Sequence, residues 1–178
     1  MSAWFLLLVA LVALERIAEL VVAKRNAKTM KRLGAVEYGA GHYPAMVALH
    51  TALLIGALVE VALRDRPFVP ALGWPMLALV VTAQALRWWC ITTLGPQWNT
   101  RILVAPGLPL VNRGPYALMR HPNYLAVVVE GMALPLVHTA WITAGLFTLL
   151  NGLVLHARIG AEDRALGQMS AIALSSRS

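Results

Sequence analysis

Between two long apolar regions, the sequence reads Gly114-Pro115-Tyr116-Ala117-Leu118-Met119-Arg120-His121-Pro122-Asn123-Tyr124-Leu125. The chain as a whole is 59% hydrophobic and has a mean hydropathy of +0.67, so this dense group of polar and aromatic residues needs a local reason. The border between a membrane and water offers one, because a polar ligand and an apolar ligand can meet there. The stretch therefore predicts a functional site at the edge of a membrane.

The composition indicates an integral membrane protein. Charged residues make up 13% of the chain, which is about half their usual share of ~25% in soluble domains. The length of 178 residues corresponds to about one domain, which we assign to residues 1–178. The single cysteine, Cys90, excludes an internal disulfide, and the scattered histidines give no metal-binding pattern. We predict an all-α, polytopic membrane protein without a metal site.

About five apolar segments are predicted to span the membrane. The first three have roughly the 20 residues that a hydrocarbon core of ~30 Å requires, and the last two form a shorter helical hairpin. Basic residues gather in the loops after the first and third segments, which predicts a cytoplasmic C-terminus and an outside N-terminus. This bias also explains the net charge of +7, so we expect membrane lipids and no nucleic acid as partners. The segments are 4–23, 43–63, 72–94, 123–137 and 140–157.

The helix predicted to start at Pro122 could bind an anion. Proline suits the first position of a helix, where its missing N–H leaves no hydrogen bond unmade. The free N–H groups and positive dipole end of such a helix attract carboxylates. Arg120, His121, Asn123 and Tyr124 add donors and aromatic surface. The alternative is an anchor in the headgroup region, which Arg, His and Tyr also favour.

A second polar group follows the last apolar segment. Arg158 and Glu162 are four residues apart and share a helix face, which Asn151 extends into a polar stripe. The alternative is an ordinary ion pair in a helix next to the membrane. Trp98, in the long 95–122 loop, is a candidate wall of the substrate site.

Glu130 lies inside an apolar segment, where a carboxylate indicates either a partner or a function. In the functional interpretation, Glu130 is a candidate base that takes a proton from a substrate hydroxyl. In the structural interpretation, it is a hydrogen-bond partner of Arg87 or Gln84. Other polar residues in or next to the first two segments are assigned mainly to contacts between helices, with substrate contact by one of them as the alternative: Glu15, Arg16, Glu19, Asn26, His42, Tyr43 and His50.

The order and spacing of these motifs resemble the isoprenylcysteine carboxyl methyltransferase family. The resemblance covers residues from about 94 to 166, and the N-terminal half is similar to a bacterial branch of the family, which implies a bacterial inner (plasma) membrane. Members of that branch are often associated with O-methylation of lipophilic polyketides such as alkylpyrones. The motifs are Gly114-Pro115-Tyr116, Arg120-His121-Pro122-Asn123-Tyr124, the apolar hairpin, and Arg158 with Glu162.

The resemblance implies S-adenosylmethionine as methyl donor, held in a cytoplasm-facing pocket, with 95–166 as the catalytic and cofactor-binding region. By position, Glu162 would hold the polar end of the cofactor, and Arg158 would orient the methyl-accepting oxygen. The other residues implied around the cofactor are Leu108, Pro109, Leu110, Val111, Tyr116, His121, Pro122, Asn123 and Tyr124.

The expected function is therefore S-adenosylmethionine-dependent O-methylation of a lipophilic small-molecule or lipidated acceptor, at a hydroxyl or a carboxylate. Two alternatives keep the methyl donor and change the acceptor to a protein C-terminal isoprenylcysteine carboxylate or to a phospholipid amine. A further alternative is a non-enzymatic small membrane transporter or assembly protein, in which buried Glu and Arg residues would line an ion path.

Overall fold

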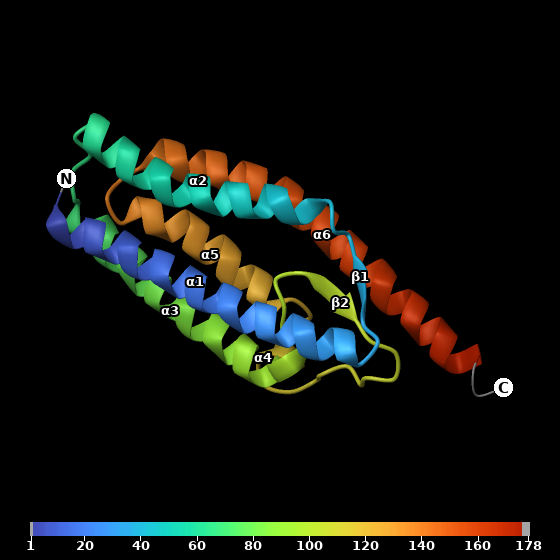
Figure 1. Ribbon diagram of the computed structural model, residues 1–178. Coiled ribbons are helices and arrows are strands. Elements are labelled where there is room, and N and C mark those ends of the chain that lie inside the picture. The colour runs from blue at the N-terminus through green and yellow to red at the C-terminus, as the bar shows by residue number, and fades with distance from the viewer. Residues whose placement is uncertain (1, 176–178) are drawn as a thin grey trace.

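Five long helices form an antiparallel bundle in the computed structural model, which describes residues 2–175, apart from the side chains of 42, 166 and 168–175. Successive long helices run in opposite directions, and the last one extends beyond the others (Figure 1). The N-terminus and the C-terminal helix end therefore lie at opposite ends of the bundle. The long helices are α1 (Ala3–Arg32), α2 (His42–Leu63), α3 (Pro70–Leu94), α5 (Pro122–Leu136) and α6 (Trp141–Ser175).

The chain is an integral membrane protein, but the predicted count of five spans is not confirmed. Among the described residues, three helices are long and apolar enough to cross a membrane. The apolar part of α1 carries Glu15, Arg16 and Glu19. Helix α5 has 15 residues, or about 22 Å at 1.5 Å per residue, which is shorter than a hydrocarbon core of ~30 Å. The three helical stretches are Tyr43–Leu63, Pro70–Gln97 and Trp141–Ala165.

Proline and glycine mark several helix ends. Pro122 occupies the first turn of α5, as predicted, and Pro70 does the same for α3. Gly95 follows α3 with φ +54°, a conformation that glycine adopts without a Cβ clash. A short turn joins α5 to α6, with Pro135 in the last turn of α5, so the predicted hairpin is present. Its second arm was predicted to be short, at 140–157, and this is wrong, because α6 continues to Ser175 and has 35 residues.

A small sheet is the one departure from an all-α fold in the described part of the chain. β1 (Val36–Tyr38) pairs antiparallel with β2 (Ile102–Val104). An ion pair of 2.7 Å between Arg101 Nη1 and Glu37 Oε1 supports the pairing. The sheet ties the connection between α1 and α2 to the long loop that follows α3. That loop also contains η1 (Gly95–Gln97) and α4 (Pro115–Leu118).

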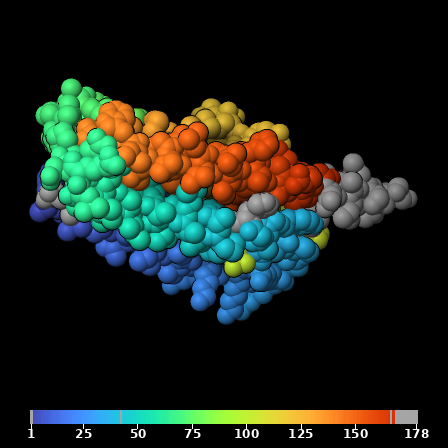
Figure 2. Space-filling view, turned by 90° about the horizontal axis from the view of Figure 1, so that it is seen from above, coloured from blue at the N-terminus to red at the C-terminus, as the bar shows by residue number. Residues whose placement is uncertain are grey.

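The two ends of the bundle differ in character. The end near the N-terminus contains an apolar core that includes the fully buried Phe5, Val61 and Val137. Along one face, α2 and α6 lie side by side (Figure 2), and outward-facing residues such as Leu149, 72% exposed, suit contact with lipid. The opposite end holds the sheet, the long loop and the start of α5, which together enclose the candidate site.

Candidate functional site

A cavity of about 500 Å³ lies between the long loop, the start of α5 and the part of α6 that carries Arg158 and Glu162. Sites for small ligands commonly have about this size, roughly 300–1,000 Å³. Pro109 and Pro122 do not border it: the Pro109 carbonyl accepts a hydrogen bond from Gln97 at 3.4 Å, and Pro122 is buried in the first turn of α5. The other residues predicted to bind a cofactor all line the cavity: Leu108, Leu110, Val111, Tyr116, His121, Asn123, Tyr124 and Glu162.

Tyr124 connects the two polar residues that the sequence placed on one face of α6. The Arg158 Nε donates to the Tyr124 hydroxyl at 3.0 Å, and that hydroxyl donates to the Glu162 carboxylate. The direction of both hydrogen bonds is the one that these groups require, because a guanidinium only donates, an ionised carboxylate only accepts, and a hydroxyl does both. The His121 ring stacks on Tyr124, with 5.3 Å between ring centroids. Tyr124 at the start of α5 is thus hydrogen-bonded to both polar residues of α6.

The first cavity carries charges of both signs. The Asp163 carboxylate lies 3.2 Å from Arg120 Nη2 and 3.7 Å from His121 Nε2. The Arg120 side chain is 78% exposed, so this group forms a rim, whereas Glu162 lies further inside beside Tyr124. A ligand with both cationic and anionic groups would find partners here.

Tyr116 reaches the cavity because Gly114 lets α4 approach α3 closely. Gly114 has φ +55°, and a Cβ there would lie 2.8 Å from Thr93 Oγ1. Burial raises the pKa of the Tyr116 phenol above its usual value, and the neighbouring Cys90 thiol raises it further. The phenol therefore stays protonated and can donate a hydrogen bond.

A second cavity, of about 420 Å³, extends along the interior of the bundle between α1, α2, α5 and α6. Its walls are mostly aliphatic and include Leu6 and Leu58 toward the N-terminal end of the bundle. Polar residues line it as well, among them His50, Asn151 and Arg158. The shape and lining suit an elongated apolar molecule with a polar end.

The two cavities share a wall. Its members are buried or half-buried, and the predicted substrate residues Trp98 and Arg158 are among them. Within the described part of the chain, Trp98 Nε1 and Asn123 Oδ1 are buried without a hydrogen-bond partner. Because such an atom costs about 1–3 kcal/mol, the pair points to a ligand that supplies the missing partners. The residues that border both cavities are Trp98, Asn99, Asn123, Tyr124 and Arg158.

Glu130 borders neither cavity and belongs to a buried network of charges. Its carboxylate pairs with Arg87 and Arg16. The Glu19 carboxylate also belongs to the network, 3.1 Å from Arg87 Nε and 2.7 Å from Arg16 Nη1, and Glu15 lies 3.9 Å from Arg16 Nε. Arg87, one of the two structural partners suggested for Glu130, is thus in contact with it, whereas Gln84 is bonded elsewhere. The role of Glu130 as a base stays a prediction.

Residues 76–168, slightly more than half of the chain, match the model of the isoprenylcysteine carboxyl methyltransferase (ICMT) family. The chain belongs to this family. The matched segment includes the long loop, α5, and the part of α6 that carries Arg158 and Glu162. Membership in the isoprenylcysteine carboxyl methyltransferase family confirms the resemblance seen in the sequence and makes the chain a membrane methyltransferase at the level of the family.

Two relatives extend this similarity beyond the matched segment. An uncharacterized protein of Bacillus subtilis (strain 168), YpbQ, is 40% identical over 167 residues, which cover 93% of this chain and 98% of that protein. An uncharacterized protein of Haemophilus influenzae is 26% identical over 157 residues, covering 86% of this chain and 90% of that protein. No solved structure matches the chain.

The sequence did not point to two residues that now lie at the site. Met46 of α2 places its sulfur 3.1 Å from Arg158 Nη1. Asn99 borders both cavities and donates to the Ala23 carbonyl at 3.0 Å, which holds the long loop against α1. The position of Asn99 directly after Trp98 was an available signal, whereas nothing in the sequence around Met46 marks it.

Proposed function

We propose that the chain is an S-adenosylmethionine-dependent O-methyltransferase that acts on a lipophilic hydroxyl or carboxylate at the membrane. One observation carries the proposal: a polar cavity and an apolar cavity share a wall that contains Arg158 and Tyr124. A charged methyl donor on one side and a lipid-soluble acceptor on the other would meet at the same guanidinium group. Family membership supports methyl transfer as the class of reaction.

The first cavity suits the methyl donor. S-adenosylmethionine has a sulfonium cation, an ammonium group and a carboxylate, and when bound it supplies an electrophilic methyl group. Glu162 offers a carboxylate to the cationic groups, whereas Arg120 and His121 offer donors to the carboxylate. Trp98 Nε1 and Asn123 Oδ1 offer one further donor and one acceptor. Apolar residues of the long loop would pack against the adenine ring: Leu108, Leu110 and Val111.

Arg158 favours an oxygen acceptor. Its guanidinium is always charged and only donates, so it attracts a carboxylate, phenolate or enolate and repels an ammonium group. This preference argues for O-methylation over methylation of a phospholipid amine. The apolar tail of the acceptor would occupy the second cavity, whose aliphatic walls lie deeper in the bundle.

Positioning provides most of the proposed catalysis. Arg158 is 7% exposed and is held by Tyr124 on one side and by Met46 on the other. A guanidinium fixed in this way can hold the acceptor oxygen in line with the methyl group without rearranging during the reaction. The buried wall between the cavities also keeps water from the reacting atoms.

We also propose that residues 1–178 form one catalytic domain, that 95–166 hold most of the site, and that the site faces the cytoplasm. The last turns of α1, at the same end of the bundle as the site, carry a group of basic residues. Basic loops remain on the cytoplasmic side, which would place the N-terminus outside the plasma membrane of a bacterium. The basic residues are Lys24, Arg25, Lys28, Lys31 and Arg32.

Calorimetric titration of the detergent-purified protein with S-adenosylmethionine tests the donor site. We expect saturable binding by the parent and its loss in Glu162→Gln. Asp65→Asn makes the same chemical change at an exposed acid outside both cavities and is expected to bind as the parent does. A folded parent that binds no S-adenosylmethionine would refute the proposal.

Transfer of a labelled methyl group then tests the acceptor. We expect product from long-chain phenols, enols or carboxylic acids. Product from a prenylated cysteine alone would identify the chain as an isoprenylcysteine carboxyl methyltransferase in the strict sense. Product from phosphatidylethanolamine alone would contradict the role given to Arg158.

A further inference from the structure

We propose that His50 is the general base that takes the proton from a hydroxyl acceptor in the second cavity. This inference rests on the proposed O-methyltransferase function and names the residue that would extend it from carboxylates to weakly acidic hydroxyls. A carboxylate acceptor is already ionised at neutral pH and needs no base, whereas a phenol or enol must lose a proton during the reaction. The observations below concern the protonation, orientation and surroundings of His50.

The hydrogen bonding of His50 leaves one ring nitrogen able to accept a proton. Its Nδ1 lies 2.8 Å from the Met46 carbonyl oxygen, and because a carbonyl can only accept, the hydrogen must be on Nδ1. In neutral imidazole the other nitrogen, Nε2, then has a free lone pair. The edge-to-face contact with Phe147, at 5.4 Å between centroids and 86° between planes, fixes the ring orientation.

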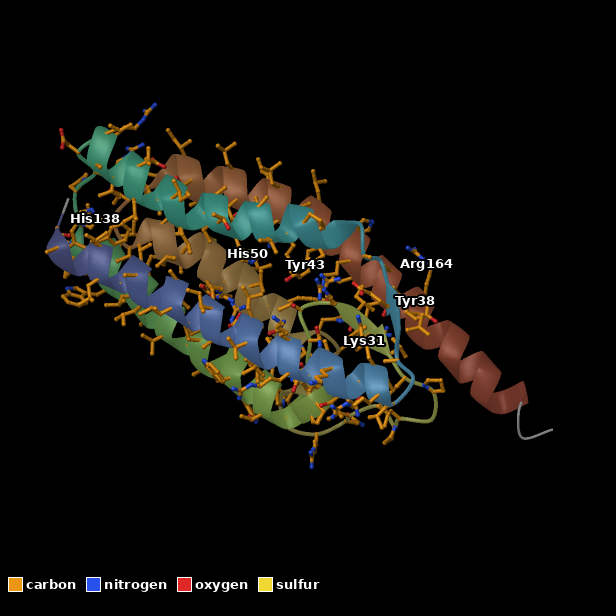
Figure 3. All side chains as sticks on the ribbon, viewed as in Figure 1. Lys31, Tyr38, Tyr43, His50, His138 and Arg164 are labelled. Atoms are coloured by element: carbon orange, nitrogen blue, oxygen red, sulfur yellow. The ribbon has the colours of Figure 1, made fainter. Side chains whose placement is uncertain are left out.

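His50 lies on the inner side of α2, toward α5 (Figure 3), and lines the second cavity together with Arg158. Met46 connects the two residues: its carbonyl holds the His50 ring, and its sulfur lies 3.1 Å from Arg158 Nη1. Met46 and His50 are one turn apart on α2, or about 6 Å along the axis at 1.5 Å per residue. An acceptor whose oxygen contacts Arg158 would therefore have His50 as a neighbour.

The buried carboxylates are less suited to this role. Glu130 pairs with two arginines and borders neither cavity, and Glu19 pairs with the same two arginines. Glu162 borders only the first cavity, on the donor side. Among the described side chains that line the second cavity, His50 is the one neutral base.

The charges around His50 come from four helices, α1, α3, α5 and α6. Guanidinium groups lie on α1, α3 and α6, and carboxylates lie on α1 and α5. Because these opposite charges balance, they do not force the imidazole into its charged form. The groups are Arg16, Arg87, Arg158, Glu15, Glu19 and Glu130.

The reaction balances with His50 as the proton acceptor. The acceptor O–H bond breaks and its proton moves to Nε2, while an oxygen lone pair forms a bond to the methyl carbon. The carbon–sulfur bond of the donor breaks and its electron pair stays on sulfur. The positive charge of the sulfonium thereby disappears as the imidazolium forms, and the imidazolium later releases its proton to water.

A binding experiment without S-adenosylmethionine tests proton transfer directly. The probe is an alkyl-chain nitrophenol, whose phenolate absorbs visible light, added at a pH below the pKa of the free phenol. We expect the parent to bind it as phenolate and His50→Asn to bind it as neutral phenol. Asparagine can still donate to the Met46 carbonyl, so the variant removes the base and keeps the structural hydrogen bond. His156→Asn makes the same change at an exposed histidine outside both cavities and should behave as the parent.

Equal phenolate absorbance in the parent and in His50→Asn would overturn the proposal. His50→Gln provides a second variant should His50→Asn fail to fold, and calorimetric titration with S-adenosylmethionine checks that each variant is folded. A folded parent that binds the donor but not the phenol would overturn both this proposal and the acceptor cavity. A parent that binds neither would overturn the proposed function as a whole.

Turnover provides the second test. We expect His50→Asn to slow methylation of a phenol by roughly 10²–10⁴-fold, the usual contribution of a general base, and to leave methylation of a long-chain carboxylate nearly unchanged. Glu130→Gln should slow both acceptors equally, because Glu130 acts through the fold. Selective slowing of the phenol by Glu130→Gln, with no selectivity in His50→Asn, would instead make Glu130 the base.

Discussion

Replacing Arg87 by methionine should destabilise the protein more than any other single change in the buried charge network. The network contains three carboxyl groups, from Glu15, Glu19 and Glu130, and two guanidinium groups, from Arg16 and Arg87. Arg87 is 3% exposed and pairs with two of the carboxylates. Its removal leaves three acids with one arginine, and two of those acids, Glu19 and Glu130, are buried.

The magnitude follows from the charge balance. Removing one partner of a buried ion pair typically costs about 3–5 kcal/mol, because the other charge is left uncompensated. Glu130→Gln, by contrast, leaves two acids with two arginines and keeps an amide that can hydrogen-bond. We expect it to cost only about 1 kcal/mol. The prediction is therefore that Arg87→Met lowers the free energy of unfolding several times more than Glu130→Gln does.

Reversible unfolding of the purified protein in mixed micelles, with increasing SDS and followed by tryptophan fluorescence, measures both values. Arg66→Met is the matched control. Arg66 is 25% exposed, and its partner Glu60 keeps hydrogen bonds from the Ile142 N–H, the Thr143 N–H and the Thr143 hydroxyl. This variant should cost about 1 kcal/mol or less. A loss for Arg87→Met no larger than that for Glu130→Gln would refute the argument from charge balance.

Three further changes address the site and the packing around it. Arg158→Ala should abolish methyl transfer and leave S-adenosylmethionine affinity largely unchanged in calorimetry; an equal loss of both would move Arg158 to the donor side. Tyr116→Phe should weaken S-adenosylmethionine binding by about 1 kcal/mol. Because the raised pKa keeps the phenol protonated, the loss should be the same in titrations at about pH 8 and about pH 10.5, where a phenol with the ordinary pKa of about 10 would be mostly ionised. Gly131→Ala would place a Cβ 1.9 Å from Phe147 Cε1 and should lower the free energy of unfolding by about 1–3 kcal/mol, whereas Gly145→Ala, with open space around it, should not.

The parts of the fold that could be predicted from the sequence are those that local chemistry determines. The apolar segment 43–63 corresponds to α2 and 72–94 to most of α3, because apolar composition and flanking proline or glycine define such helices. The shared face of Arg158 and Glu162 follows from helix periodicity alone. Their common partner Tyr124 was anticipated only as part of the motif around the start of α5.

The remaining features depend on contacts between distant parts of the chain. The strands β1 and β2 have three residues each and lie more than sixty positions apart, so neither carries a periodic signal. Glu130 meets Arg16 from the first helix as well as Arg87, and only the packing of three helices brings these groups together. The place of His50 in the second cavity depends likewise on how α2 is rotated in the bundle.

The single hydroxyl of Tyr124 has a thermodynamic consequence for the order in which two ligands bind. It accepts from Arg158, on the acceptor side, and donates to Glu162, on the donor side. A ligand that binds Glu162 changes the hydrogen bond from the Tyr124 hydroxyl to Glu162. The hydrogen bond from Arg158 to the same hydroxyl then changes as well. Any cooperativity that arises in this way must be reciprocal. An acceptor that tightens the binding of the methyl donor by some factor will be bound more tightly, by that same factor, once the donor is in place.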